Sequence, residues 1–117
     1  LKFEEKTSFT IPKKVKDLEK PIRLSRIPSL SATYQFHALQ LFKVTLKWPA
    51  QDDDRVVYRI YERSGESKKL VGSVKGKGEY EIPYINIFSE HFYQVVPYNP
   101  QTHQEGEGTD FVSPRWE

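Results

Sequence analysis

The amino-acid sequence predicts an all-β protein, a seven-stranded antiparallel sandwich, on the basis of three observations. From residue 28 onward, apolar side chains alternate with polar ones in short runs, and this period of two is typical of half-buried strands. Turn residues separate the runs at intervals of roughly 8 to 12 residues, as they do in sandwich folds. Aromatic residues make up 14% of the 117 residues, and aromatic side chains favour pleated surfaces. No run has the sustained period of an amphipathic helix.

Seven segments carry the strand pattern. The clearest is 42–48, where apolar side chains alternate with Lys43, Thr45 and Lys47 before Pro49 ends the run. Successive side chains of a strand point to opposite faces, so we expect the apolar side of this strand to be buried and its Lys/Thr side to be wet. The other predicted strands are 30–36, 56–62, 69–74, 79–82, 92–98 and 109–112. Their number and spacing predict an immunoglobulin-like topology.

One hydrophobic core is expected, because a chain of 117 residues makes one domain rather than two. We place this domain at 28–113, between a leader at 1–27 and a tail at 114–117. Trp48 is expected at the centre of the core. The predicted core residues are Leu30, Val44, Leu46, Trp48, Tyr58, Ile60, Ile82, Ile85, Tyr93 and Val95.

The leader differs from the rest of the chain in charge. Residues 1–27 hold eight Lys/Arg against four Asp/Glu, a net charge of +4, whereas residues 28–117 hold ten against twelve, a net charge of −2. Pro12 and Pro21 disfavour the helical conformation in the residues before them. We therefore interpret the leader as a charged linker in which 9–11 is a candidate docked strand. The chain does not begin with Met, so we interpret it as a fragment of a longer protein.

The sequence offers little chemistry for catalysis. The absence of Cys excludes disulfides, thiolate zinc sites and thiol nucleophiles. His37, His91 and His103 lie in different segments without a second ligand at metal-binding spacing. The Asp residues of 52–54 are expected in a solvated loop, because adjacent carboxylates on an extended chain point in alternate directions. We therefore predict no enzyme, with no catalytic residue, cofactor or metal, and the modest charge of the leader predicts no nucleic-acid partner.

Three of the predicted strands, in order, resemble strands of the fibronectin type III family. Residues 44–49 (VTLKWP) resemble its strand that ends in a core Trp followed by Pro, and 58–63 (YRIYER) resemble its Tyr-x-Val-Tyr-Arg strand. Residues 93–99 (YQVVPYN) resemble its Tyr-x-Val-x-Ala-x-Asn strand. Two positions depart from the family pattern: His91 stands at the usual tyrosine corner, and Pro97 stands where a small Ala is common. We expect His91 to be a corner residue that hydrogen-bonds to the backbone.

The leader carries a second resemblance. Residues 9–15 (FTIPKKV) resemble the Phe-x-x-Pro-x-x-Val segment that leaves the transpeptidase domain in class A penicillin-binding proteins, some of which carry a fibronectin-like module behind it. The two resemblances together imply a non-catalytic spacer or binding module of an exported bacterial cell-surface protein involved in cell-wall synthesis. They also imply an extracellular location in the cell envelope, a membrane-anchored parent protein and a catalytic domain upstream.

Two alternatives stay open at this point. In the first, the leader completes an upstream catalytic domain. In the second, the chain is an accessory module of an extracellular glycosidase or adhesin.

One strand face combines charge with an aromatic ring. Arg59, Tyr61 and Arg63 alternate on the side of the 56–62 strand opposite Tyr58 and Ile60. Lys and Arg side chains hold polyanions, and flat rings stack on sugars. We therefore predict that these three residues form a ligand-binding face for a cell-wall polymer, such as peptidoglycan or teichoic acid, or for a partner protein. The alternative is a face covered by a neighbouring strand, and the chain is expected to be a monomer.

Overall fold

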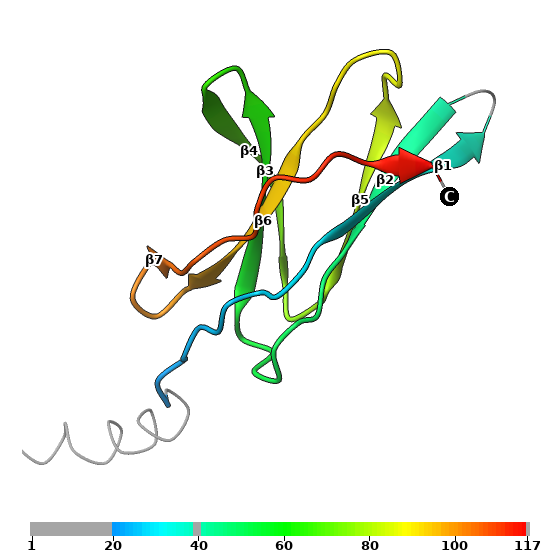
Figure 1. Cartoon of the computed structure of the whole chain (residues 1–117). Helices are drawn as coiled ribbons and strands as arrows, with labels where there is room; N and C mark the ends of the chain where they lie inside the picture. The colour runs from blue at the N-terminus through cyan, green and yellow to red at the C-terminus, as the bar shows by residue number, and fades with distance from the viewer. Residues whose placement is uncertain (1–19, 39–40, 117) are drawn as a thin grey trace, which may run out of the picture.

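The computed structural model describes residues 20–38 and 41–116, and within them eight strands form two four-stranded sheets around a shared core (Figure 1). The first sheet has the order β5-β2-β1-β8 and consists of β1 (Ser31–Ala38), β2 (Leu41–Lys47), β5 (Glu79–Ile85) and β8 (Arg115–Trp116). The second sheet has the order β4-β3-β6-β7 and consists of β3 (Val57–Ser64), β4 (Ser67–Lys75), β6 (Tyr93–Asn99) and β7 (Gln104–Glu105). Residues 20–38 and 41–116 contain no helix that could span a bilayer. The predicted docked strand at 9–11 lies outside the described residues.

The predicted all-β sandwich is confirmed, with eight strands rather than seven. The segment 109–112 is not a strand, and the two-residue strands β7 and β8 arise in the predicted loop and tail. Thr109 N donates to Val95 O at 3.0 Å, and Val112 exchanges two backbone bonds with Tyr93. One extra residue thus lies between these contacts on the 109–112 side and interrupts the ladder, as a bulge does. Because β8 pairs parallel with β1, the sandwich is not wholly antiparallel.

The core forms where the alternating pattern placed it. Val44 and Leu46 of β2 are fully buried, and Trp48, just after the strand, is 5% exposed. The other predicted core residues are either buried (Tyr58, Ile60, Tyr93, Val95) or partly buried against the core (Leu30, Ile82, Ile85). The prediction left out five buried residues of the core cluster, Ile22, Ile27, Ala32, Tyr34 and Val56, and the buried Val96 outside that cluster.

The polar side of β2 is drier than expected. Thr45 is 3% exposed, and its hydroxyl donates to Gln35 Oε1 at 2.9 Å. Since β2 lies between β1 and β5, longer side chains flank this short one, including Lys43 in its ion pair with Glu81 at 3.1 Å. The expectation of a wet Lys/Thr side therefore holds for Lys47, which is exposed, and is wrong for Thr45.

Trp48→Ala is expected to lower the free energy of unfolding by roughly 3 to 5 kcal/mol, because truncating a buried aromatic side chain removes its packing and leaves a cavity. The Trp48 and Tyr58 ring centroids lie 5.5 Å apart, so the change also removes a contact between the two sheets. Thermal and urea unfolding measure the loss. Phe88→Ala is the control, because the Phe88 side chain is 93% exposed. The unfolding midpoint of this variant should equal that of the parent chain. An unchanged midpoint for Trp48→Ala would show that the predicted strand 42–48 is misplaced.

Candidate functional surfaces

The predicted ligand-binding face lies on the outer side of the second sheet. β3 runs between β4 and β6 and turns Tyr58 and Ile60 into the core. Arg59 and Tyr61 alternate with these two residues and are only partly covered, while Arg63 is exposed further along β3. The structure joins Arg59 and Tyr61 through a third residue, and Arg63 stands apart from that contact.

Glu105 of β7 connects Arg59 and Tyr61. Its Oε2 accepts a hydrogen bond from the Tyr61 hydroxyl and forms an ion pair with Arg59 Nη1 at 3.2 Å. β7 pairs with the end of β6, where the Tyr98 ring lies 3.8 Å from the Arg59 guanidinium. Partial burial and the Glu105 carboxylate raise the pKa of Tyr61, so its hydroxyl stays protonated and donates. Tyr61 and then Glu105 raise the pKa of Arg59, which keeps the guanidinium charged.

The other cations of this surface also lie over aromatic rings. Lys68 Nζ is 4.2 Å from the centroid of the Tyr61 ring and donates to Gln94 Oε1 at 2.9 Å. The Arg63 guanidinium is 4.2 Å from the centroid of the Phe92 ring. Tyr61 is therefore not a bare platform for a sugar ring, because a cation covers one of its faces.

Sequence alternation on one strand does not find every member of this surface. Lys68, Tyr98 and Glu105 come from β4, β6 and β7, and only the pairing of these strands brings them to β3. The period of two gives the face of each side chain, whereas its cross-strand neighbour depends on register. No pattern within a single strand could have identified Glu105.

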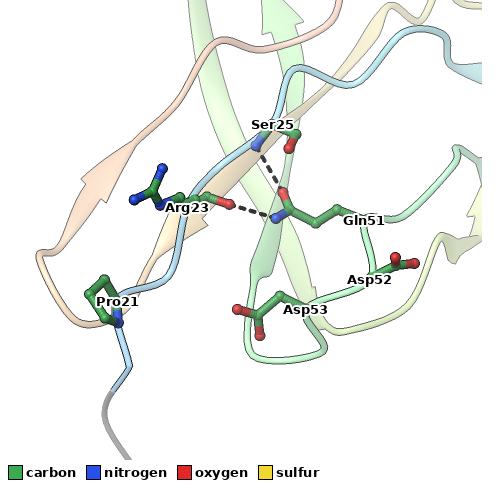
Figure 2. A pocket seen from close by; sticks show the side chains of 6 residues that line it. All are labelled: Pro21, Arg23, Ser25, Gln51, Asp52 and Asp53. Atoms are coloured by element: carbon green, nitrogen blue, oxygen red, sulfur yellow. Dashed lines mark hydrogen bonds between the residues drawn. The ribbon is translucent and has the colours of Figure 1, made fainter. Parts of the chain in front are cut away.

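A second candidate surface is the end of the sandwich where residues 20–25 enter, and we call this segment the strap (Figure 1). The strap belongs to the predicted leader, yet side chains of the sandwich hold its backbone. Gln51 Nε2 donates to Arg23 O at 2.6 Å, and Gln51 Oε1 accepts from Ser25 N at 3.0 Å, as Figure 2 shows with dashed lines. One amide side chain thus pairs with the strap as a neighbouring strand would.

Three further side chains hold the beginning of the strap. Gln101 Oε1 accepts from Ile22 N and Gln101 Nε2 donates to Lys20 O, both at 2.9 Å. Asn99 Nδ2 donates to Ile22 O at 2.9 Å, and Arg55 Nη1 donates to Lys20 O at 2.8 Å. All these bonds reach backbone atoms, and the Ile22 side chain between them is 6% exposed. The described part of the predicted leader therefore packs on the sandwich.

An open hollow lies between the strap and the loop after β2, lined by Pro21, Arg23, Ser25, Gln51, Asp52 and Asp53 (Figure 2). Asp53 is engaged by Arg55, with Nη2 2.7 Å from Oδ2 and Nε 2.9 Å from Oδ1. The hydrogen bonds from Arg55 lower the pKa of Asp53 to about 2. Within residues 20–38 and 41–116, no group of three or more His, Cys, Asp or Glu is placed to hold a metal ion.

The two histidines whose side chains are described do not converge. His91 Nε2 lies 2.7 Å from Asn86 O, which confirms the predicted bond from a corner residue to the backbone. His91 Nδ1 lies 3.0 Å from Glu62 Oε2. His103 is exposed in the loop before β7, and the side chain of His37 is outside the description. The imidazole of His91 thus fixes a loop.

Comparisons with known proteins give one relative by sequence and two similar structures. No protein-family model matches the chain. It is 56% identical over 107 residues to penicillin-binding protein 1F of Bacillus subtilis (strain 168), a match that covers 92% of this chain and 15% of that protein. The structure is similar to the fibronectin type III domain of human fibronectin type III domain containing protein 3, with a TM-score of 0.53, 12% identity and coverage of 84% of this chain and 94% of that chain. The chain has the fold of a fibronectin type III domain.

Part of a pectate lyase has a similar fold. The match to Pel3 from Pectobacterium carotovorum has a TM-score of 0.52 and 12% identity, and it covers 73% of this chain and 26% of that chain. Likeness at such identity shows the fold alone. The two predicted resemblances, to the fibronectin type III fold and to a penicillin-binding protein, are confirmed. The chain spans 15% of the length of penicillin-binding protein 1F, so the match concerns a segment of that protein.

Hydrogen exchange tests the strap at single amides. The Ile22 and Ser25 amides should exchange slowly, because they donate to Gln101 and Gln51. Gln51→Ala should accelerate exchange at Ser25 and leave Ile22 slow, and Gln101→Ala should do the reverse. Each variant is thus the control for the other. Equal acceleration at both amides in either variant would show that the two side chains do not act locally.

Asp53 is expected to make stability depend on pH in acid. Its pKa falls from the ordinary 3.8 to about 2 on folding, so the stabilisation is fully present above 3.8 and is lost as pH falls through about 2. Urea unfolding of the parent chain and of Asp53→Asn, measured between pH 6 and pH 2, gives the contribution as a difference. That difference should be constant above about pH 5 and shrink toward about pH 2. A constant difference across the whole range would contradict the ion pair with Arg55.

Proposed function

We propose that the chain is a non-catalytic module of a bacterial penicillin-binding protein in the cell envelope, and that it acts as a spacer. The observation that carries the proposal is the 56% identity to a segment of penicillin-binding protein 1F. The fold supports it, because a fibronectin type III sandwich is a self-contained body with its own core. Export, a membrane-anchored parent protein and a part in cell-wall synthesis belong to the same proposal.

The strap supports the spacer role. Side chains of the sandwich hold backbone atoms from Lys20 to Ser25, so the chain enters the sandwich in a defined direction. A spacer needs a fixed direction at the point of attachment, whereas a flexible linker would let the module move independently of its neighbour. The bonds also explain how a segment rich in charge remains part of the folded body.

Labelling with a fluorescent penicillin tests the proposal. We expect the longer protein that carries this chain to be acylated, and the isolated 117-residue chain to remain unlabelled. The longer protein without residues 28–116 should retain acylation, because the module contributes no residue to the chemistry. A covalent penicillin adduct on the isolated chain, detected by mass spectrometry, would contradict the non-catalytic assignment.

The same labelling separates the two alternatives. If the leader completes an upstream catalytic domain, removing residues 1–19 from the longer protein abolishes acylation, and removing 28–116 does not. If the chain is an accessory module of an extracellular glycosidase or adhesin, the longer protein does not bind penicillin. The spacer proposal expects acylation in all three forms of the longer protein.

A further inference from the structure

The outer surfaces of the two sheets differ in charge. Among the described residues, the outer register positions of the second sheet carry four cations and one carboxylate: Arg59, Arg63, Lys68, Lys75 and Glu105. We call this set the basic face. On the first sheet, by contrast, Lys43 pairs with Glu81 at 3.1 Å, and Lys47 lies opposite Glu79. Arg115 of β8 lies on the same side, so the first sheet has three cations against two carboxylates, an excess of +1, and the second sheet has the larger excess of +3.

Three of the four cations of the basic face, Arg59, Arg63 and Lys68, lie over aromatic rings. Arg59 lies over Tyr98 and Lys68 over Tyr61, at 3.8 Å and 4.2 Å from the ring centroids. Cation–π contacts restrict the ends of these long side chains, so less rotamer entropy is lost when they bind a ligand. The same contacts cover the rings that a sugar would need for stacking. The basic face therefore suits anions better than neutral sugars.

The spacing of the cations suits an extended polymer. Alternate residues of a strand lie about 7 Å apart, because the rise is about 3.4 Å per residue. Arg59 and Arg63 flank Tyr61 on β3, and Lys68 lies over the Tyr61 ring between them. Three cations thus lie along β3 in the order Arg59, Lys68 and Arg63, and an extended phosphodiester chain can pass them in turn.

We propose that the basic face binds an extended phosphodiester polymer of the poly(glycerol phosphate) type, and that Glu105 limits the affinity. Arg59, Lys68 and Arg63 each contact one phosphate, because guanidinium and ammonium groups form charge-assisted hydrogen bonds with phosphate oxygens. Glu105 opposes binding, since it neutralises Arg59 at 3.2 Å and places a like charge beside the polymer. This inference goes beyond the spacer role and rests on the charge of the described residues, not on the parent protein.

Titration of the 117-residue chain with poly(glycerol phosphate) tests the proposal. We expect shifts of backbone amides to cluster at 59–63, at 68 and at 105. Calorimetry at several salt concentrations should give a slope of log K against log salt of about −2, which is about 0.7 for each of three phosphates on a single strand. Absence of binding at millimolar phosphate repeat and low salt would overturn the proposal.

Substitutions test the part played by Glu105. Glu105→Gln keeps an oxygen that accepts the Tyr61 hydroxyl but removes the charge, and it should raise affinity about three- to tenfold, the effect of one charge near the surface. Glu81→Gln removes the same charge from the first sheet and should leave affinity unchanged. Arg63→Gln and Lys68→Gln should each lower affinity and flatten the salt slope. A gain of affinity cannot come from misfolding, and equal gains in the two Glu variants would overturn the assignment to the basic face.

Competing ligands give the remaining outcomes. A single-stranded oligonucleotide of equal charge should bind more weakly than poly(glycerol phosphate), because its bulky bases must lie against rings that are already covered by cations. Tighter binding of the oligonucleotide would overturn the polymer assignment in favour of nucleic acid. Neutral glycan fragments should cause no shifts. Shifts at Tyr61 and Tyr98 with these fragments would show that the rings are open to stacking and would overturn the assignment of the basic face to anions.

Discussion

The contact between Trp48 and Tyr58 determines where both candidate surfaces lie. Trp48 follows β2 of the first sheet and packs on Tyr58 of β3 in the second, with ring centroids 5.5 Å apart. Because side chains of a strand alternate, the inward position of Tyr58 sends Arg59 outward. The Tyr58 hydroxyl also accepts a hydrogen bond from Gln51 N at 2.9 Å and so fixes the residue that holds the strap. One contact between the sheets therefore orients the basic face and the strap together.

Alternation along a strand gives the face of each side chain, and strand register determines which side chains of neighbouring strands lie beside it. The pairing of β3 with β4 shifts between Ile60 and Tyr61, and beyond this bulge Lys68 lies opposite Arg63. In an uninterrupted ladder Lys69 would take that place, since a shift by one residue moves each side chain to the other face. The bulge is therefore the reason that Lys68, and not its neighbour, lies over the Tyr61 ring. A small irregularity of the backbone thus sets the composition of the basic face.

The strands with clean alternation could be predicted from the sequence, whereas segments held by side-chain hydrogen bonds could not. β2 and β3 follow the period of two, and their inner side chains are buried as expected. Ile22 lies in a charged segment without such a period, and bonds from Gln51, Asn99 and Gln101 fix the backbone around it. These partners are distant in sequence, and no local pattern links them to the strap. Glu105 escaped prediction for a related reason, because its position depends on the pairing of the short β7 with β6.

The ion pair of Arg59 with Glu105 contributes little to stability, so the fold alone does not account for its position on the basic face. Exposed ion pairs are worth about 0 to 1 kcal/mol, and both side chains of this pair are 32% exposed. Arg59 also lies over Tyr98, a contact that does not require Glu105. The charge of the basic face can therefore change without a change of fold. Trp48, by contrast, cannot be replaced without a loss of core packing. Substitutions at such surface residues can alter the affinity for other molecules and leave the fold intact.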